Sequence, residues 1–165
     1  MRQKLAVTAM RDTSLEDLKW MEAAFCLAEK AGALGEIPVG AVVIYDGAII
    51  GEGSNSKETD HNPLAHAEMT ALAAASQARG AWRLSGCTLY VTLEPCGMCA
   101  GALIQSRIDR LVYGTRDSKT GAVHSLYQML SDTRLNHQVE VVEGVLADRS
   151  QALLKKFFAD LRKQR

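Results

Sequence analysis

The chain has 165 residues, of which 47% are hydrophobic and 23% charged, so one globular domain with a substantial core is expected. No apolar run approaches the ~20 residues of a membrane span, and Leu5 to Val7 is too short for a signal-peptide core. We therefore expect a soluble cytoplasmic enzyme with no membrane contact. The net charge is zero, yet residues 101–165 carry 11 Lys and Arg against 7 Asp and Glu. This basic part could attract a phosphate backbone, or it could reflect ordinary solvated helix faces.

The first elements are predicted from capping and turn signals. Residues 1–13 show no clear period and are predicted to form a loose arm before a single domain at 14–165. Ser14, followed by Asp17, is typical of a helix start, and Gly32 lies where that helix should end. Two β-rich runs follow, Val39 to Tyr45 and Ala48 to Ile50. The Asp46-Gly47 dipeptide between them predicts a hairpin, because a type I′ turn needs positive φ at both central residues.

The rest of the chain alternates between helical and extended patterns. The predicted elements are, in order, a helix over 66–79, a strand over 87–93, a helix over 96–106, a strand over 108–113, a short helix over 124–130, a strand over 139–145 and a helix from 148 onward. This alternation predicts an α/β fold, a three-layer α/β/α sandwich with a five-stranded mixed sheet.

The cysteines indicate a metal site rather than disulfides, because a cytoplasmic protein without a secretion signal is expected. Cys96 and Cys99 are three residues apart in the first turn of a predicted helix, so they share a face where the helix dipole stabilises thiolates. His66, at the start of another helix, can supply a third ligand. Three protein ligands leave one tetrahedral position open, as in catalytic zinc sites. Cys87 and Cys26 are predicted to be core residues.

Glu68 lies two positions after His66, about 200° around an ideal helix. That angle argues against both residues binding one metal ion directly. A carboxylate beside an activated water could instead move protons between the water and a leaving group. The alternative is an exposed glutamate in the first turn of a helix, where acidic residues are favoured.

The pairing of His66-Ala67-Glu68 with Pro95-Cys96-Gly97-Met98-Cys99 resembles the H-x-E and P-C-x-x-C signature of zinc deaminases. The resemblance implies one zinc ion per subunit, bound by His66, Cys96 and Cys99, with Glu68 as the general acid and base.

A broader similarity points to the bacterial tRNA adenosine deaminases. It covers nearly everything from Ser14 onward and includes Pro38 to Val43, the R-D-x-K-T-G segment Arg116 to Gly121, and Phe157-Phe158. It implies hydrolytic deamination of adenosine to inosine at the wobble position of a tRNA anticodon. It also implies a homodimer and a target base flipped out of the anticodon stem-loop.

The same resemblance implies a set of substrate contacts. The base would be bound by Asn55, Ile37 and Leu93, and the RNA backbone would face Asp117, Lys119 and Thr120. Ile37 and Leu93 could instead be core residues, and Lys119 could be a solvated loop charge.

The final helix adds one aromatic candidate. Leu154, Phe157, Phe158 and Leu161 have the spacing of a stripe that faces a core, and Leu153 widens the stripe on the Phe157 side. Phe158 is therefore left at the edge of the stripe, where an aromatic ring could stack on an RNA base.

Three other functions compete with tRNA deamination. A deaminase of free cytosine, cytidine, dCMP or guanine would keep the same zinc site and differ around it. A structural zinc adaptor would need a fourth metal ligand, and none is evident in the sequence. A thioredoxin-like redox protein would leave the His66-Ala67-Glu68 segment unexplained.

Overall fold

The computed structural model describes residues 13–165, so residues 1–12 of the predicted arm lie outside it. The predicted sandwich with a five-stranded mixed sheet is confirmed. The elements are α1 (Leu15–Ala33), β1 (Gly40–Tyr45), β2 (Ala48–Ser54), α2 (Ala67–Arg79), β3 (Thr88–Leu93), α3 (Gly97–Gln105), β4 (Arg110–Thr115), a 3-10 turn η1 (Met129–Ser131), β5 (Glu140–Glu143) and α4 (Ala147–Lys163).

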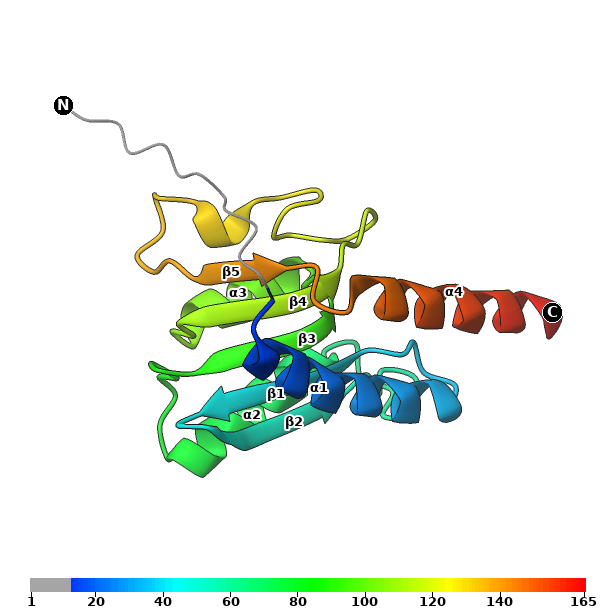
Figure 1. The fold of residues 1–165 in the computed structure, drawn as a ribbon, viewed down its shortest axis with the longest axis horizontal. Coiled ribbons are helices and arrows are strands. Elements are labelled where there is room, and N and C mark those ends of the chain that lie inside the picture. The colour runs from blue at the N-terminus through cyan, green and yellow to red at the C-terminus, as the bar shows by residue number, and fades with distance from the viewer. Residues whose placement is uncertain (1–12) are drawn as a thin grey trace.

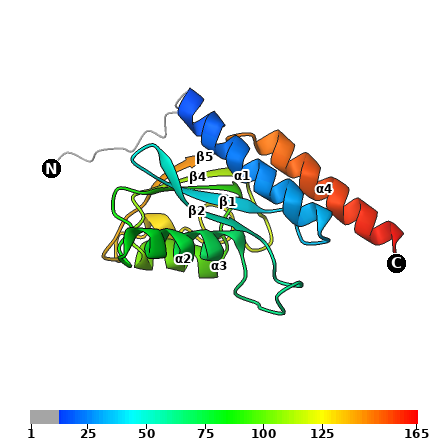
Figure 2. The same cartoon turned by 90° about the horizontal axis from the view of Figure 1, so that it is seen from below.

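The sheet has the strand order β2-β1-β3-β4-β5. Strand β1 is antiparallel to both β2 and β3, whereas β3, β4 and β5 run parallel. Helices α2 and α3 cover one face of the sheet, and α1 and α4 lie side by side on the other (Figures 1 and 2). No helix within residues 13–165 has both the length and the apolar character needed to span a bilayer.

Alternation along β1 divides the core between the two faces. Ala41 and Val43 belong to the cluster beneath α2 and α3, and Val42 and Ile44 belong to the cluster beneath α1. Successive side chains of a strand point to opposite faces, so a strand covered on both sides is apolar throughout. The sheet is therefore buried by helices on both faces.

The hairpin forms as predicted. Asp46 and Gly47 have φ values of 49° and 73°, the positive values that a type I′ turn needs. Strand β2, however, extends to Ser54 rather than stopping near residue 50. Its glycines weaken the strand signal in the sequence, but they let α2 pack closely on the sheet. A Cβ atom on Gly53 would lie 2.1 Å from the carbonyl oxygen of Ala67.

Two local expectations are wrong. Residues 124–128 are not helical, and only the 3-10 turn η1 (Met129–Ser131) forms at the end of the expected short helix. The chain there folds around the carboxylate of Glu94, which accepts hydrogen bonds from the N–H groups of His124 and Ser125. Cys26 is exposed rather than buried, because it lies beside the buried stripe of α1 and not on it.

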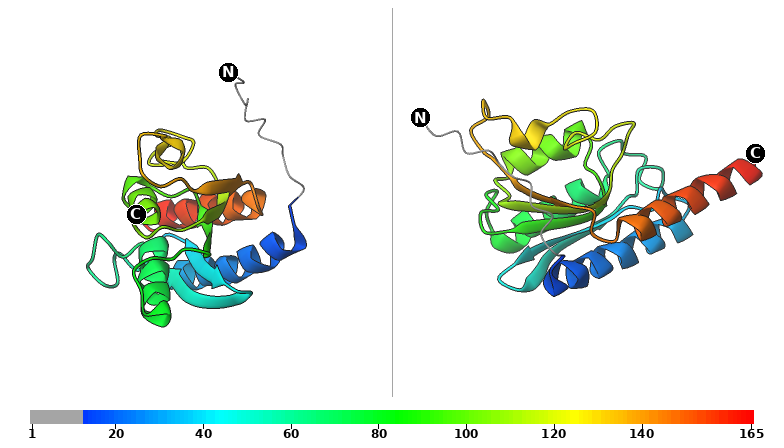
Figure 3. Two further views of the ribbon diagram at one scale, coloured as in Figure 1. Left: turned by 90° about the vertical axis from the view of Figure 1, so that its left-hand side faces the viewer. Right: turned by 45° about the horizontal axis from the view of Figure 1, so that its top comes forward.

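Helix α4 contributes little to the core. Among its residues only Ser150 is buried, so its apolar stripe does not face a core as the spacing suggested. The helix also continues past the end of the sheet (Figures 1 and 3). Its apolar residues are therefore available to another surface.

The close packing of α2 on β2 predicts a specific sensitivity to added volume. Gly53→Ala should lower the free energy of unfolding by about 1–3 kcal/mol, because its Cβ would overlap the α2 backbone. Gly101→Ala is the matched control. Its Cβ would come no closer than 3.9 Å to a neighbour, and removing a helical glycine is neutral or stabilising. Urea unfolding measures both, and equal losses in the two variants would contradict the packing argument.

Candidate active site

The three predicted metal ligands meet where two helices begin. His66 is the N-cap of α2 and Cys96 is the N-cap of α3, both in extended conformation. Neither side chain caps its own helix, so both are free to project into the space between the helices. Cys99 lies one turn into α3 and is buried. The carboxyl end of β3 leads into Cys96 through Pro95.

The ligand atoms are close enough to share one ion. His66 Nδ1 lies 3.6 Å from Cys96 Sγ and 3.6 Å from Cys99 Sγ, and all three atoms lie within 4.8 Å of one another. Within residues 13–165, no other group of three potential ligands converges in this way. Cys87 is buried in the core, as predicted, and supplies no fourth ligand.

The electrostatics of the two thiols favour a bound cation. The Cys99 thiol donates a hydrogen bond that lowers the pKa of Cys96 to about 4, and the same interaction, with burial, raises the pKa of Cys99. The pair therefore keeps one proton. A divalent cation would release that proton, and two thiolates with one imidazole form a donor set that zinc prefers.

Glu68 lies in the same pocket as His66, although an ideal helix would separate them by about 200°. That angle does not apply, because His66 is in extended conformation and precedes the helix. Glu68 is only 4% exposed, so the alternative of an exposed glutamate is wrong. Burial raises the pKa of Glu68 to about 7, near the value that suits proton transfer at neutral pH.

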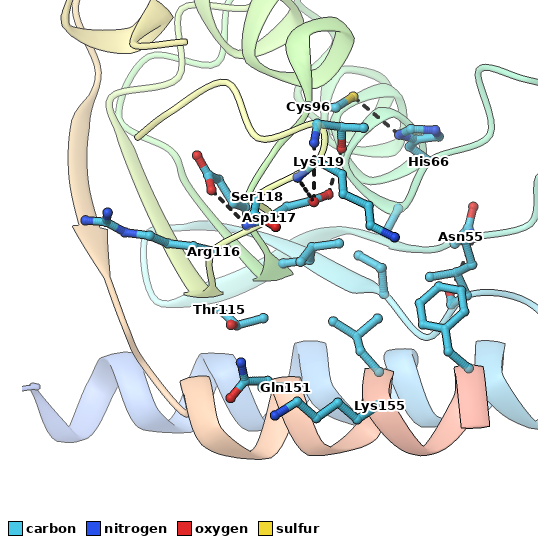
Figure 4. A pocket seen from close by; sticks show the side chains of 18 of the residues that line it. Asn55, His66, Cys96, Thr115, Arg116, Asp117, Ser118, Lys119, Gln151 and Lys155 are labelled. Atoms are coloured by element: carbon cyan, nitrogen blue, oxygen red, sulfur yellow. Dashed lines mark hydrogen bonds between the residues drawn. The ribbon is translucent and has the colours of Figure 1, made fainter. Parts of the chain in front are cut away.

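A pocket of about 960 Å³ connects this centre with α4. Figure 4 shows Gln151 and Lys155 of α4 lying across the pocket from His66, Cys96 and the loop that carries Lys119. Every predicted site residue except the buried Cys99 lines it. The lining includes Ile37, Asn55, His66, Glu68, Leu93, Cys96, Asp117, Lys119, Thr120 and Phe158.

The predicted base contacts lie near the metal ligands. Asn55 is buried, and its Nδ2 donates to the Ile37 carbonyl oxygen at 3.3 Å. Ile37 and Leu93 line the pocket while also packing against the core beneath α2 and α3. The two residues therefore pack against the core and line the pocket at once, and their contact with a base stays a prediction.

The predicted backbone contacts form one compact loop. The Asp117 carboxylate accepts hydrogen bonds from the N–H of Lys119 at 2.9 Å and from the hydroxyl of Thr120 at 2.6 Å. Asp117 therefore shapes the loop from within. Arg116, at the start of the loop, makes two 2.8 Å hydrogen bonds to Glu143.

One wall of the pocket is basic, and its residues were not singled out by the sequence beyond the basic character of residues 101–165. This wall carries Lys57, Arg116, Lys155 and Arg162, beside the neutral Gln151. On α4 the lining residues recur at helical spacing with Phe158, a signal that was available in the sequence. The cations give the outer pocket a positive character, which attracts phosphate groups.

The comparisons with known proteins agree with this geometry. The sequence pattern of the MafB19-like deaminases matches residues 15–162. The fold and the site are thus those of a deaminase, an enzyme that acts on C–N bonds of nucleobases.

More specific relatives narrow the class. A tRNA-specific adenosine deaminase from Bacillus subtilis (strain 168) is 46% identical over 150 residues, which cover 91% of this chain and 93% of the relative. The chain belongs to the family of tRNA-specific adenosine deaminases.

Two solved structures are also similar. One comes from a study of A-to-I editing by tRNA:A34 deaminases at the wobble position of transfer RNA. It is 40% identical, has a TM-score of 0.80, and the match covers 82% of this chain and 99% of that one. The other, a guanine deaminase from Nitrosomonas europaea, is 25% identical with a TM-score of 0.76 over 90% and 86%.

The ligand geometry generates a metal-binding prediction. The purified protein should hold about one zinc ion per chain. Cys96→Ser and Cys99→Ser should each weaken zinc binding by more than the roughly 10–100-fold caused by losing a supporting contact. The exposed Cys26→Ser is the control and should keep full occupancy. Metal analysis after dialysis against a chelator measures this, and full retention in either ligand variant would exclude the site.

Proposed function

We propose that the protein deaminates adenosine to inosine at the wobble position of a tRNA anticodon by zinc-dependent hydrolysis. One observation carries the proposal. A buried carboxylate, Glu68, and a zinc-type ligand set of His66, Cys96 and Cys99 lie in a pocket that continues along a basic helix, α4. The centre suits the chemistry, and the outer pocket suits a polyanionic substrate.

The chain's own residues divide the catalytic work. Zinc bound by His66, Cys96 and Cys99 would lower the pKa of a water molecule and make it a nucleophile at neutral pH. Glu68 would accept a proton from that water and deliver protons to the ring nitrogen and to the departing amine. The purine gains the oxygen of water at C6 and loses ammonia, so the reaction needs no redox partner.

Different parts of the pocket would bind the target base and the RNA that flanks it. Asn55, Ile37 and Leu93 would hold the flipped adenine near Glu68. The volume of about 960 Å³ exceeds what one base requires, and the cations on the loop and on α4 would take the flanking phosphates. Lys119, Thr120 and the loop shaped by Asp117 would contact the RNA backbone.

We also propose a cytoplasmic homodimer with one zinc ion per subunit. These points rest on the resemblance of the sequence to the tRNA adenosine deaminases. Deamination of a free base is the second candidate, favoured by the similarity to the guanine deaminase. Such an enzyme would have no use for the basic α4 wall.

Product analysis tests the proposal. The zinc-loaded protein should convert adenosine to inosine in an anticodon stem-loop, while free adenosine, cytidine and guanine remain unchanged, as measured by mass spectrometry. Glu68→Ala should keep zinc but lose at least the ~10²–10⁴-fold typical of general acid–base catalysis. Turnover of free bases or nucleosides without turnover of the stem-loop would reject the RNA substrate.

Substitution of Phe158 should weaken RNA binding and leave the stability of the fold nearly unchanged. It is 38% exposed and lines the pocket, whereas the adjacent Phe157 is partly buried and does not. Phe158→Ala should weaken stem-loop binding by about 1–3 kcal/mol through lost stacking, at nearly unchanged melting temperature. Phe157→Ala is the control on the same helix. It should bind RNA normally and lose less than the ~3–5 kcal/mol of a fully buried phenylalanine.

Titration of a labelled stem-loop and thermal melting separate the two variants. Normal RNA binding by Phe158→Ala would show that the ring only packs against its neighbours.

A further inference from the structure

Glu94 is a buried carboxylate that is neither one of the three potential metal ligands nor the residue proposed to transfer protons. It follows β3, immediately before Pro95 and Cys96, and is only 2% exposed. Its oxygens accept hydrogen bonds from the backbone N–H groups of four residues and from one hydroxyl. The donors are the N–H groups of Asp117, Val123, His124 and Ser125 and the hydroxyl of Ser125.

The negative charge of Glu94 is balanced by these donors. Among the ion pairs found within residues 13–165, none involves Glu94. A buried carboxylate that accepts this many hydrogen bonds fixes the backbone that supplies the donors.

The two carboxylate oxygens accept backbone hydrogen bonds from different segments. Oε1 accepts from the N–H groups of Val123, His124 and Ser125 at 3.1, 2.7 and 2.9 Å. Oε2 accepts from the Asp117 N–H at 2.9 Å and from the hydroxyl of Ser125. Asp117 in turn shapes the pocket loop, so Oε2 is the link between the strand end and residues 116–121.

The loop is fitted to this carboxylate. A Cβ atom on Gly121 would lie 2.4 Å from Glu94 Cδ, so a side chain there would displace the carboxylate. Cys96 forms an isolated β-bridge with Gly121, and the N–H of Ala122 donates to the Pro95 carbonyl oxygen at 2.8 Å. The segment that supplies a metal ligand and the segment that lines the outer pocket therefore share one anchor.

We propose that Glu94 is a positioning residue that holds loop 116–121 in the conformation in which Lys119 and Thr120 face the RNA substrate. The inference rests on the proposed function, because it assigns the loop to substrate binding. Glu94 acts through the loop and does not touch the reacting atoms.

Glu94→Gln isolates the Oε2 link. If the amide oxygen takes the Oε1 position, the three N–H groups at 123–125 keep their acceptor. The amide NH₂ then faces the Asp117 N–H, donor against donor, while the Ser125 hydroxyl can rotate to accept. The variant should therefore release Asp117 alone, and the amides at 117–120 should exchange hydrogen faster than in the wild type.

The kinetic effect should fall on binding. KM for the stem-loop should rise about tenfold, the effect of one lost charge-assisted hydrogen bond, with kcat and zinc content unchanged. Ser125→Ala is the matched control on the same carboxylate. It removes the hydroxyl donor and leaves the Asp117 link, so KM and the exchange at 117–120 should match the wild type.

Gly121→Ala provides a second route. Its Cβ would lie 2.4 Å from Glu94 Cδ and 2.5 Å from the Asp117 carbonyl oxygen, so it should separate the carboxylate from the loop at this junction. The same rise in KM is expected, which keeps the test available if Glu94→Gln does not fold. Wild-type KM and wild-type exchange at 117–120 in Glu94→Gln would overturn the inference. Zinc loss with faster exchange throughout 117–125 would also overturn it, because Glu94 would then support the whole site. A wild-type protein without activity on the stem-loop would instead reject the proposed function.

Discussion

The convergence of two helix N-termini is the constraint on which the rest of the site depends. His66 and Cys96 are both N-caps, and Cys99 lies one turn further along α3. The ends of α2 and α3 must therefore lie within a few ångströms of each other, and the sheet sets that distance. Glycines of β2 let α2 pack closely on the sheet, and the end of β3 leads into the start of α3 on the same face. Both dipoles point their positive ends at this centre, where they stabilise the anionic sulfurs.

Negative and positive side chains lie at different depths of the pocket. The inner pocket holds carboxylates, Glu68 beside the ligands and Glu94 behind the loop, and both are almost fully buried. The cations lie further out, on the loop and along α4. Buried carboxylates are tolerated only when hydrogen bonds or a cation compensate them, and this chain uses backbone donors for Glu94. Arg116 is paired with Glu143, whereas none of the ion pairs found within residues 13–165 involves Lys119, Lys155 or Arg162. The positive charge of these three side chains therefore remains available to a substrate.

Structural features that depend on neighbouring residues could be predicted from the sequence, whereas features that depend on residues far along the chain could not. The Ser14 cap and the Asp46-Gly47 turn depend on neighbours a few residues away, and the structure shows both as expected. Cys96 and Cys99 share one short motif, whereas His66 comes from a second motif 30 residues before Cys96, and the structure brings the three potential ligand atoms together. The short helix expected at 124–130 failed because its backbone binds Glu94, about 30 residues earlier in the chain. The length of β2 and the exposure of the α4 stripe depend on what packs against them, which periodicity does not contain. Family resemblance supplied Asn55 and the loop, which no spacing argument had reached.

Helix α4 contributes little to the core, and this has an evolutionary consequence. This helix forms a wall of the pocket, and only Ser150 among its residues is buried, so substitutions at its exposed positions change little of the folding free energy. The three potential zinc ligands and Glu68 lie at the starts of α2 and α3, the helices that cover one face of the sheet. If α4 contacts the substrate as proposed, a deaminase of this design can acquire a new substrate by altering α4 while its chemistry stays intact. Divergence among relatives that act on different nucleobases should accordingly concentrate on this helix.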